Sequence, residues 1–268
     1  MIRDITIGQY YPTKSVIHSL DPRTKIIGTL LFIISLFMFD SFIGYGIVTV
    51  FLAACIIMSK VPFSYMIKGL KAIVMLLLLT VVINMFLTPG EPLVKVIGLT
   101  ITKEGLRTAV FMGIRLMYLI IGSSVMTLTT TPNNLTDALE RLLNPLKKIK
   151  VPVHEIAMMM SIALSFIPIL IEETDKIMKA QMARGADFEN KNIIKRVKSY
   201  IPILVPLFIS AFRRAGDLAM AMEARCYHGG EGRTKMKPLK YARIDYIAYV
   251  MMLIYMVFVV VIPKLIYI

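Results

Sequence analysis

The sequence contains no tryptophan, only two cysteines and three histidines, and 18% charged residues. Two cysteines cannot make a disulfide framework, and since Cys55 lies in an apolar run while Cys226 lies in a charged region, no disulfide is expected. The histidines and cysteines are too scattered to predict a metal site. His154-Glu155 begins no H-E-x-x-H motif, because Met158 stands where the second histidine would be.

Signatures for binding nucleotides or nucleic acids are also missing. Gly230 and Gly232 belong to no G-x-x-x-x-G-K-[ST] sequence, which excludes ATP binding through a P-loop. The net charge of +14 raises nucleic acid as a partner, but no basic and aromatic interleaving accompanies it. No apolar run carries the paired carboxylates of a proton-coupled carrier. We therefore expect a non-catalytic chain with no cofactor, for which other chains supply energy and substrate selectivity.

Apolar residues dominate instead, at 57% of the chain with a mean hydropathy of +0.71. This composition is far outside the range of soluble globular proteins. It predicts an all-α, polytopic integral membrane protein with about five transmembrane helices and three amphipathic helices on one side. The predicted spans are 26–39, 42–58, 72–88, 105–131 and 246–262. The polar start of the chain has no compact apolar run, so no cleaved signal peptide is expected.

Positive charge is concentrated in residues 132–243, which hold 19 of the 31 Lys and Arg residues but 11 of the 17 Asp and Glu residues. This surplus between apolar spans predicts the cytoplasmic side of a multi-pass protein of the cell membrane. It should also attract anionic lipid headgroups. The sequence thus divides into an N-terminal membrane region with four spans (1–131), a cytoplasmic-side region (132–243) and a C-terminal span (244–268).

Polar residues near the spans give local expectations. Asp21 followed by Pro22 predicts a helix start, after an interfacial arm in which His18 is interpreted as a hydrogen-bonded residue and not a metal ligand. Asn84 is expected to bond a neighbouring helix, and residues 94–101 to pair as a short hairpin. Arg115 leaves two readings open: a structural tie to backbone carbonyls or Asp40, or a role at an interface with a partner.

Two long helical patterns between residues 154 and 227 end in the same A-x-x-A-R signature, at 180–184 and at 221–225. Arginine followed by glycine suits any helix C-terminus, so one copy would indicate only a cap. Two copies, each ending a long amphipathic helix, favour a function. Pro168 is expected to kink the first helix. Charges crowd the second half of both helices, so neither is expected to span the bilayer, and residues 186–198 are predicted to form a charged connector.

With these features the chain resembles the transmembrane T component of the energy-coupling factor (ECF) transporters, EcfT. The resemblance rests on the two A-x-x-A-R ends and on the Asp21-Pro22-Arg23-Thr24-Lys25 segment. It implies that both ends bind grooves on a pair of ATPase subunits through Ala183, Arg184, Gly185, Ala224, Arg225 and Cys226. Cys226 departs from the family pattern, which has glycine there, so the geometry after Arg225 is less certain than that after Arg184.

Methionines recur along both long helices, and this flexible side chain suits surfaces that repack against several partners. Methionine also simply fills membrane cores. In the resembling family the two long helices carry exchangeable substrate-binding S components. The resemblance therefore implies that an S component is contacted by Met158, Met159, Met160, Phe208, Phe212 and Met220.

The resemblance therefore implies a coupling subunit that transmits the ATP-driven motion of two ATPase subunits to an S component for vitamin or micronutrient uptake. One alternative is a permease subunit of a conventional ABC importer, which uses an E-A-A…G loop. The segment Ala180 to Gly185 approaches that motif and lacks the rest of it. A second alternative is a self-contained secondary carrier.

Overall fold

The computed structural model describes residues 10–96, 99–186, 188, 192–230, 236 and 238–266. The described chain forms two compact units. One contains Leu139–Pro238, and the other combines Gly8–Ala138 with Leu239–Ile268. The last helix of the chain thus belongs to the same unit as the first, and the intervening hundred residues fold separately.

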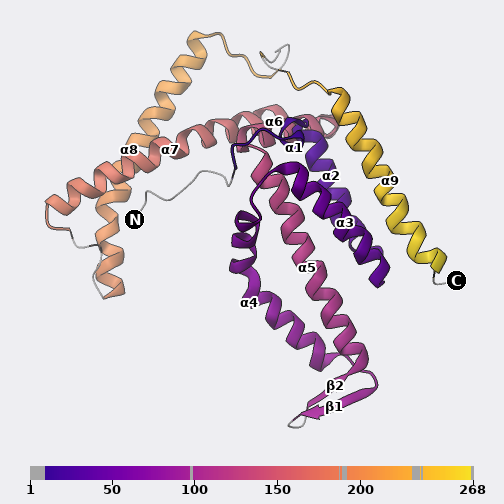
Figure 1. Cartoon of the computed structure of the whole chain (residues 1–268). Coiled ribbons are helices and arrows are strands. Elements are labelled where there is room, and N and C mark those ends of the chain that lie inside the picture. The colour runs from indigo at the N-terminus through magenta and orange to yellow at the C-terminus, as the bar shows by residue number, and fades with distance from the viewer. Residues whose placement is uncertain are drawn as a thin grey trace. The chain divides into compact units, whose positions relative to one another are not determined.

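The unit made of both ends of the chain is a helical bundle (Figure 1). Its elements are α1 (Val16–Ser19), α2 (Pro22–Ser35), α3 (Phe42–Ser59), α4 (Phe63–Leu87), β1 (Pro92–Val96), β2 (Leu99–Thr102), α5 (Lys103–Thr129) and α9 (Arg243–Ile266). The strands pair antiparallel between α4 and α5, which confirms the predicted hairpin. Helix α6 (Pro132–Leu143) begins in this unit and ends in the other.

Short polar side chains start three of these helices. The Asp21 carboxylate accepts a hydrogen bond from the Arg23 backbone N–H at 2.8 Å, with Pro22 at the first helical position of α2. Ser41 and Thr102 cap α3 and α5 in the same way. Each cap satisfies a backbone donor that the first turn of a helix leaves free. The predicted helix start at Asp21-Pro22 is confirmed.

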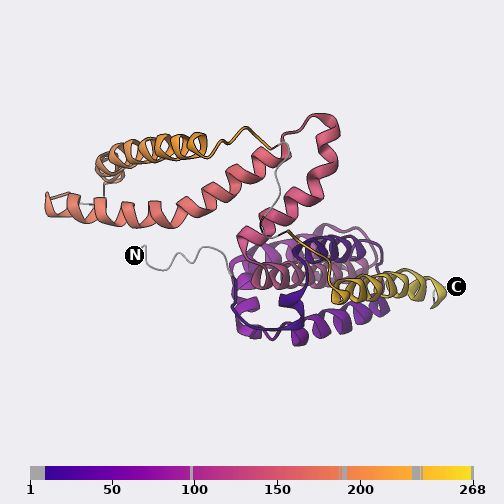
Figure 2. The same cartoon turned by 90° about the horizontal axis from the view of Figure 1, so that it is seen from above.

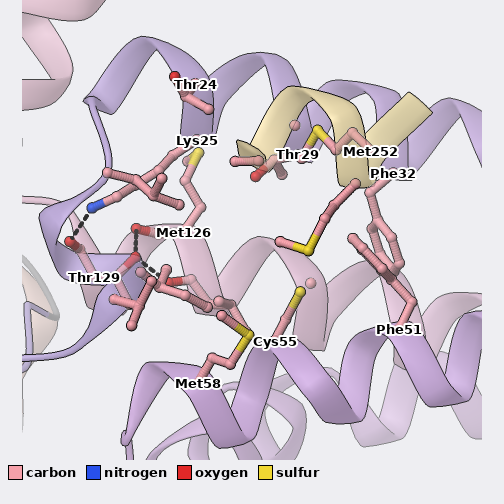
Figure 3. Close-up of a pocket in the computed structure, with 18 of the residues that line it drawn as sticks. Thr24, Lys25, Thr29, Phe32, Phe51, Cys55, Met58, Met126, Thr129 and Met252 are labelled. Carbon is pink, nitrogen blue, oxygen red and sulfur yellow. Dashed lines mark hydrogen bonds between the residues drawn. The ribbon is translucent and has the colours of Figure 1, made fainter. Parts of the chain in front are cut away.

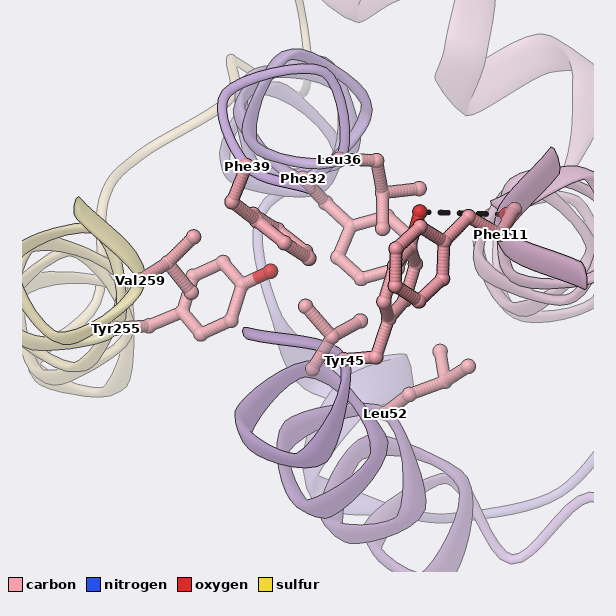
Figure 4. Close-up of a cluster of buried hydrophobic side chains, with 9 residues drawn as sticks. Phe32, Leu36, Phe39, Tyr45, Leu52, Phe111, Tyr255 and Val259 are labelled. Atoms are coloured by element: carbon pink, nitrogen blue, oxygen red, sulfur yellow. Dashed lines mark hydrogen bonds between the residues drawn. The ribbon is translucent and has the colours of Figure 1, made fainter. Parts of the chain in front are cut away.

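Aromatic rings from four segments form the centre of the bundle (Figure 4). The cluster consists of Phe32, Leu36, Phe39, Tyr45, Val48, Leu52, Phe111, Tyr255 and Val259. The Tyr45 hydroxyl donates to the Phe111 carbonyl at 3.3 Å, and the hydroxyls of Ser35 and Tyr255 share a hydrogen bond of 2.8 Å. Buried tyrosine hydroxyls thus find partners, as the interior requires.

Helix α2 is tied to α5 by one basic side chain near each of its ends. Lys25 Nζ donates to the Thr129 carbonyl at 2.8 Å at one end. At the other end the Arg115 guanidinium donates to the Phe39 carbonyl at 3.2 Å and to Asp40 Oδ1 at 2.6 Å. The structure therefore confirms the first of the two readings of Arg115, a structural tie within the bundle.

Glycines let the helices of this unit approach closely. A Cβ atom at Gly122 would lie 2.4 Å from the Phe32 ring, and one at Gly28 would lie 1.9 Å from Met252 Cε. Beside these contacts α1, α2, α3, α5 and α9 line an open apolar pocket of about 340 Å³ (Figure 3). Met126 and Cys55 line it, and Lys25 lies at one end.

Two local expectations have different outcomes. His18 is hydrogen-bonded as predicted: its Nδ1 lies 2.6 Å from Ser15 Oγ and its Nε2 lies 3.0 Å from the Tyr11 carbonyl. The expectation for Asn84 is wrong, because its amide donates to the Thr80 carbonyl of the same helix at 2.8 Å. The side-chain amide thus finds a hydrogen-bond acceptor one turn earlier in its own helix and needs none on a neighbouring helix.

The structure confirms a polytopic, helical membrane protein. Among the described residues, four helical stretches are long and apolar enough to cross a bilayer: Phe42–Ser59, Lys103–Thr129, Val153–Ala183 and Arg243–Pro263. A shorter apolar stretch covers Ile73–Leu87. The total of five spans stays a prediction. Val153–Ala183 meets the criterion by length and composition although it was not expected to span the bilayer, because its apolar first half outweighs its charged second half.

The unit Leu139–Pro238 consists of the end of α6, a 3₁₀ turn (Asn144–Ile149), α7 (Val153–Ala183) and α8 (Ile193–Ala224). Proline removes a helix hydrogen bond and clashes with the preceding turn, so Asn144-Pro145 predicts a kink or an end in the helix before it. Helix α6 does end at Leu143, and a 3₁₀ turn follows. The predicted charged connector at 186–198 is too long. Helix α8 already begins at Ile193, because the Asn192 side chain caps it by accepting from the Ile194 N–H at 3.1 Å.

Candidate functional site

The two A-x-x-A-R signatures end α7 and α8 with the same backbone geometry. After α7, the Ala186 N–H donates to the Gln181 carbonyl and the Gly185 N–H to the Met182 carbonyl, both at 3.0 Å. After α8, the Tyr227 N–H donates to the Met222 carbonyl at 3.0 Å and the Cys226 N–H to the Glu223 carbonyl at 2.9 Å. Both ends are therefore Schellman caps, with the arginine as the last residue before the left-handed position.

Cys226 adopts the same left-handed backbone that glycine adopts at the first end. Its φ is +54°, against +87° at Gly185. Side chains are disfavoured in this region because Cβ approaches the backbone oxygen. The structure nevertheless retains the cap, so the replacement of glycine by cysteine changes the strain at this position and not the direction of the chain after Arg225.

Both arginines are exposed at the ends of their helices. Neither guanidinium forms an ion pair or a hydrogen bond with any other residue that the structure describes. A guanidinium offers five donors in a planar fork, which fits carboxylates and carbonyls in fixed geometry. Since the caps satisfy the backbone carbonyls nearby, each helix end presents a guanidinium that no described residue occupies, at the end of a fixed helical turn. We call residues 183–185 and 224–226 the two tips.

Helices α7 and α8 cross in Figure 1 and lie in adjacent layers in Figure 2. An ion pair joins them: Arg214 donates from its NH2 group to Glu173 Oε2 at 3.0 Å. A weaker contact of 3.5 Å runs from the Gln181 side-chain amide to the Pro202 carbonyl. Each helix contains proline, at Pro168 in α7 and at Pro202 and Pro206 in α8, and both helices continue through these positions.

The second tip and the first half of α7 line the same groove. The groove is lined by Met158, Ile162, Leu218, Met222, Arg225, Cys226, Tyr227, His228 and Gly229. Further along, Gly230 packs on His154 so closely that a Cβ atom would lie 2.5 Å from the ring. His154 Nδ1 lies 2.9 Å from Glu140 Oε1 of α6. The segment after the second tip thus returns to the start of α7.

The residues expected to contact an S component do not form one patch. Met159 and Met160 are exposed near the start of α7, whereas Met158 is half-buried in the groove beside the second tip. Phe208 and Phe212 stack at 6.4 Å along α8, with Phe212 75% exposed. Met220 is exposed near the end of α8. These residues form a discontinuous apolar surface along both helices.

Sequence reasoning missed the ion pair between Glu173 and Arg214 and the contact of Gly230 with His154. Glu173 and Arg214 are 41 positions apart, as the two arginines of the tips are, so they occupy equivalent positions on the two helices. That spacing does not predict a contact, and no sequence pattern predicts the packing of Gly230 on His154. Within the part of the chain that the structure describes, no three His, Cys, Asp or Glu side chains gather into a group that could hold a metal ion.

Comparisons with known proteins identify the family of the chain. A family profile described as CbiQ, cobalt transport protein, matches residues 13–236. The energy-coupling factor transporter transmembrane protein EcfT of Clostridium kluyveri is 59% identical over 250 residues, covering 92% of this chain and 93% of the relative. The EcfT of Thermosediminibacter oceani is 55% identical (93% and 94% covered), and that of Bacillus subtilis is 48% identical (91% and 93% covered). Similarity of this extent confirms the resemblance inferred from the residues: the chain belongs to the family of energy-coupling factor transporter transmembrane proteins.

Proposed function

We propose that this chain is the coupling subunit of an ECF-type importer in the cell membrane, with the unit Leu139–Pro238 on the cytoplasmic side. It transmits the motion of two separate ATPase subunits, which hydrolyse ATP, to a substrate-binding S component that takes up a vitamin or another micronutrient. The chain itself is not an enzyme. The observation that carries the proposal is the pair of identically capped helix ends, each with an exposed arginine that pairs with no residue in the described part of the chain.

The mechanism follows from the rigidity of the tips. A Schellman cap fixes the last turn of each helix, so a force on Arg184 or Arg225 moves the whole helix and not just a side chain. When the ATPase subunits close, the two tips approach each other or separate with them. Helices α7 and α8 then change their mutual angle, and the exposed apolar surface along them re-orients the S component that rests on it.

Reversing the charge of the tips tests the ATPase contact. Arg184→Glu combined with Arg225→Glu should abolish copurification of both ATPase subunits and leave membrane insertion intact, because a carboxylate repels the acceptors that a guanidinium binds. Arg141→Glu is the matched control, since Arg141 is an exposed arginine of α6 remote in sequence from both tips. If the double variant retains both ATPases, the proposal fails.

Stoichiometry separates this function from a conventional ABC permease. Two tips on one chain serve two ATPases, so native mass spectrometry of the complex should give one copy of this chain per ATPase pair. Two copies per pair would favour a permease with one docking loop per subunit. Binding of substrate by the purified chain alone would favour a self-contained carrier.

A further inference from the structure

The ion pair between Glu173 and Arg214 occupies equivalent positions on the two repeated helices. Glu173 lies eleven residues before Arg184, and Arg214 lies eleven residues before Arg225. At about 1.5 Å per residue, each tip is therefore about 16 Å along its helix from the pair. The ion pair joins the two helices at the same distance from their C-terminal ends, so the helical segments between the pair and the two tips have equal length.

The two parts that extend beyond the ion pair are continuous helix. Residues 174–183 of α7 and 215–224 of α8 contain no proline, whereas all three internal prolines of α7 and α8 precede the pair. A helix without proline keeps its complete ladder of backbone hydrogen bonds and bends little. Each tip therefore moves with the side chain of the pair on the same helix.

The surroundings of the pair offer no equivalent contact. Glu172, Lys176, Arg213 and Asp217 lie within one turn of it, and all four are exposed on their own helices. Glu173 and Arg214 are the ones that point between the helices, with side-chain exposures of 28% and 39%. Among the described residues, this is the one ion pair that joins α7 to α8.

A pair this exposed contributes little to stability, because water screens the charges and ordering two long side chains costs entropy. It does constrain orientation, since the guanidinium and the carboxylate are in contact over a small range of helix crossing angles only. The pair therefore affects the orientation of the two helices more than the stability of their contact.

We infer that Glu173 and Arg214 are positioning residues that set the crossing angle of α7 and α8, and through it the separation of the two tips. The inference rests on the proposed function for its consequence in transport, but its geometric part concerns this chain alone. Neither residue contacts a substrate, and each acts through the helix that carries it.

The geometric part is tested on the full-length chain in lipid nanodiscs. Spin labels at Lys179→Cys and Met220→Cys occupy equivalent exposed positions near the two tips, in a background of Cys55→Ala and Cys226→Gly. The parent should give one narrow distance distribution by pulsed electron double resonance. Glu173→Gln should broaden it, Glu172→Gln should not, and the exchanged pair Glu173→Arg with Arg214→Glu should restore it. An unchanged distribution in Glu173→Gln overturns the inference.

The consequence is tested on the assembled transporter. Glu173→Gln should keep both ATPases bound and lower substrate uptake per ATP hydrolysed by about two- to fivefold, the range that a partly exposed ion pair can produce. The exchanged pair should recover most of this loss. Uptake per ATP equal to that of the parent would overturn the inference. Loss of the ATPases from the parent itself would instead refute the proposed function, and the distance measurement would still decide the geometry.

Discussion

At the scale of single residues, the backbone of Cys226 is strained. Cys226 has φ of +54° at a position where the equivalent residue after α7 is Gly185. A left-handed backbone costs a residue with a side chain about 1–2 kcal/mol relative to glycine. This strain is retained at the second tip, where the backbone turns immediately after Arg225.

Replacing Cys226 relieves or increases that strain. Cys226→Gly should raise the free energy of unfolding by about 1 kcal/mol, and Cys226→Val should lower it because a β-branched side chain fits the left-handed region worst. Thermal unfolding of the purified chain in detergent measures both. A glycine variant that unfolds at a lower temperature than the parent would contradict the assigned backbone geometry.

Arg115 and Asp40 should contribute unequally, although they form one ion pair. The Asp40 side chain is 76% exposed, so Asp40→Asn should change the stability by less than about 1 kcal/mol. Arg115 is buried, donates to the Phe39 carbonyl and lies 5.3 Å from the centre of the Phe37 ring. Arg115→Ala should therefore cost about 2 kcal/mol through lost packing and an unpaired carbonyl. Equal losses in the two variants, measured by denaturant titration in micelles, would argue against this division.

At the scale of elements, helix boundaries were predicted well where local chemistry sets them. Asp21 caps the helix that follows it, and Pro145 lacks the backbone N–H that would continue the helix before it. Both effects depend on neighbouring residues in the sequence, so the sequence alone predicts these boundaries. The start of α8 was placed too late, because Asn192 was not recognised as a cap within a charged stretch. The contacts of Arg115 depend on which segments are neighbours, and no local pattern specifies that. Asn84 was assigned to a neighbouring helix although a partner one turn back in its own helix was available.

Two glycines in the bundle offer a matched test of helix packing. Both would place a new Cβ atom in contact with a facing side chain, Phe32 at Gly122 and Met252 at Gly28. Gly122→Ala should destabilise the chain by about 1–3 kcal/mol, because the Phe32 ring is buried and cannot move aside. Gly28→Ala should be tolerated, since the end of the methionine side chain can rotate. The reverse order of unfolding temperatures would be inconsistent with this packing.

On the scale of the whole molecule, the orientation in the membrane can be read from its two cysteines. Cys226 is exposed at the second tip and Cys55 is half-buried in the apolar helix α3. When the chain is produced without its ATPase subunits, a membrane-impermeant maleimide should label Cys226 in inverted vesicles and not in intact cells, because the proposed function places the tips in the cytoplasm. Cys226→Gly should remove the label. Labelling of intact cells that this variant abolishes would place the tips outside.

The candidate site was predictable in position but not in geometry. The repeat of A-x-x-A-R located Arg184 and Arg225, and helix-end chemistry explained why arginine could stand there. The joining of α7 to α8 through Glu173 and Arg214 was not predicted, since a contact between residues 41 positions apart depends on how two helices cross. The position of Met158 beside the second tip depends on the same crossing.

The last helix of the chain has a consequence for synthesis. The backbone N–H of Asp21 donates to Asp245 Oδ1, 224 residues later, and Ser35 bonds Tyr255 of the same helix α9. A ribosome must therefore finish residues 36–242 before the first helices of the bundle acquire these partners. Until then the nascent chain holds an incomplete bundle in the membrane, where chaperones and membrane proteases can recognise it.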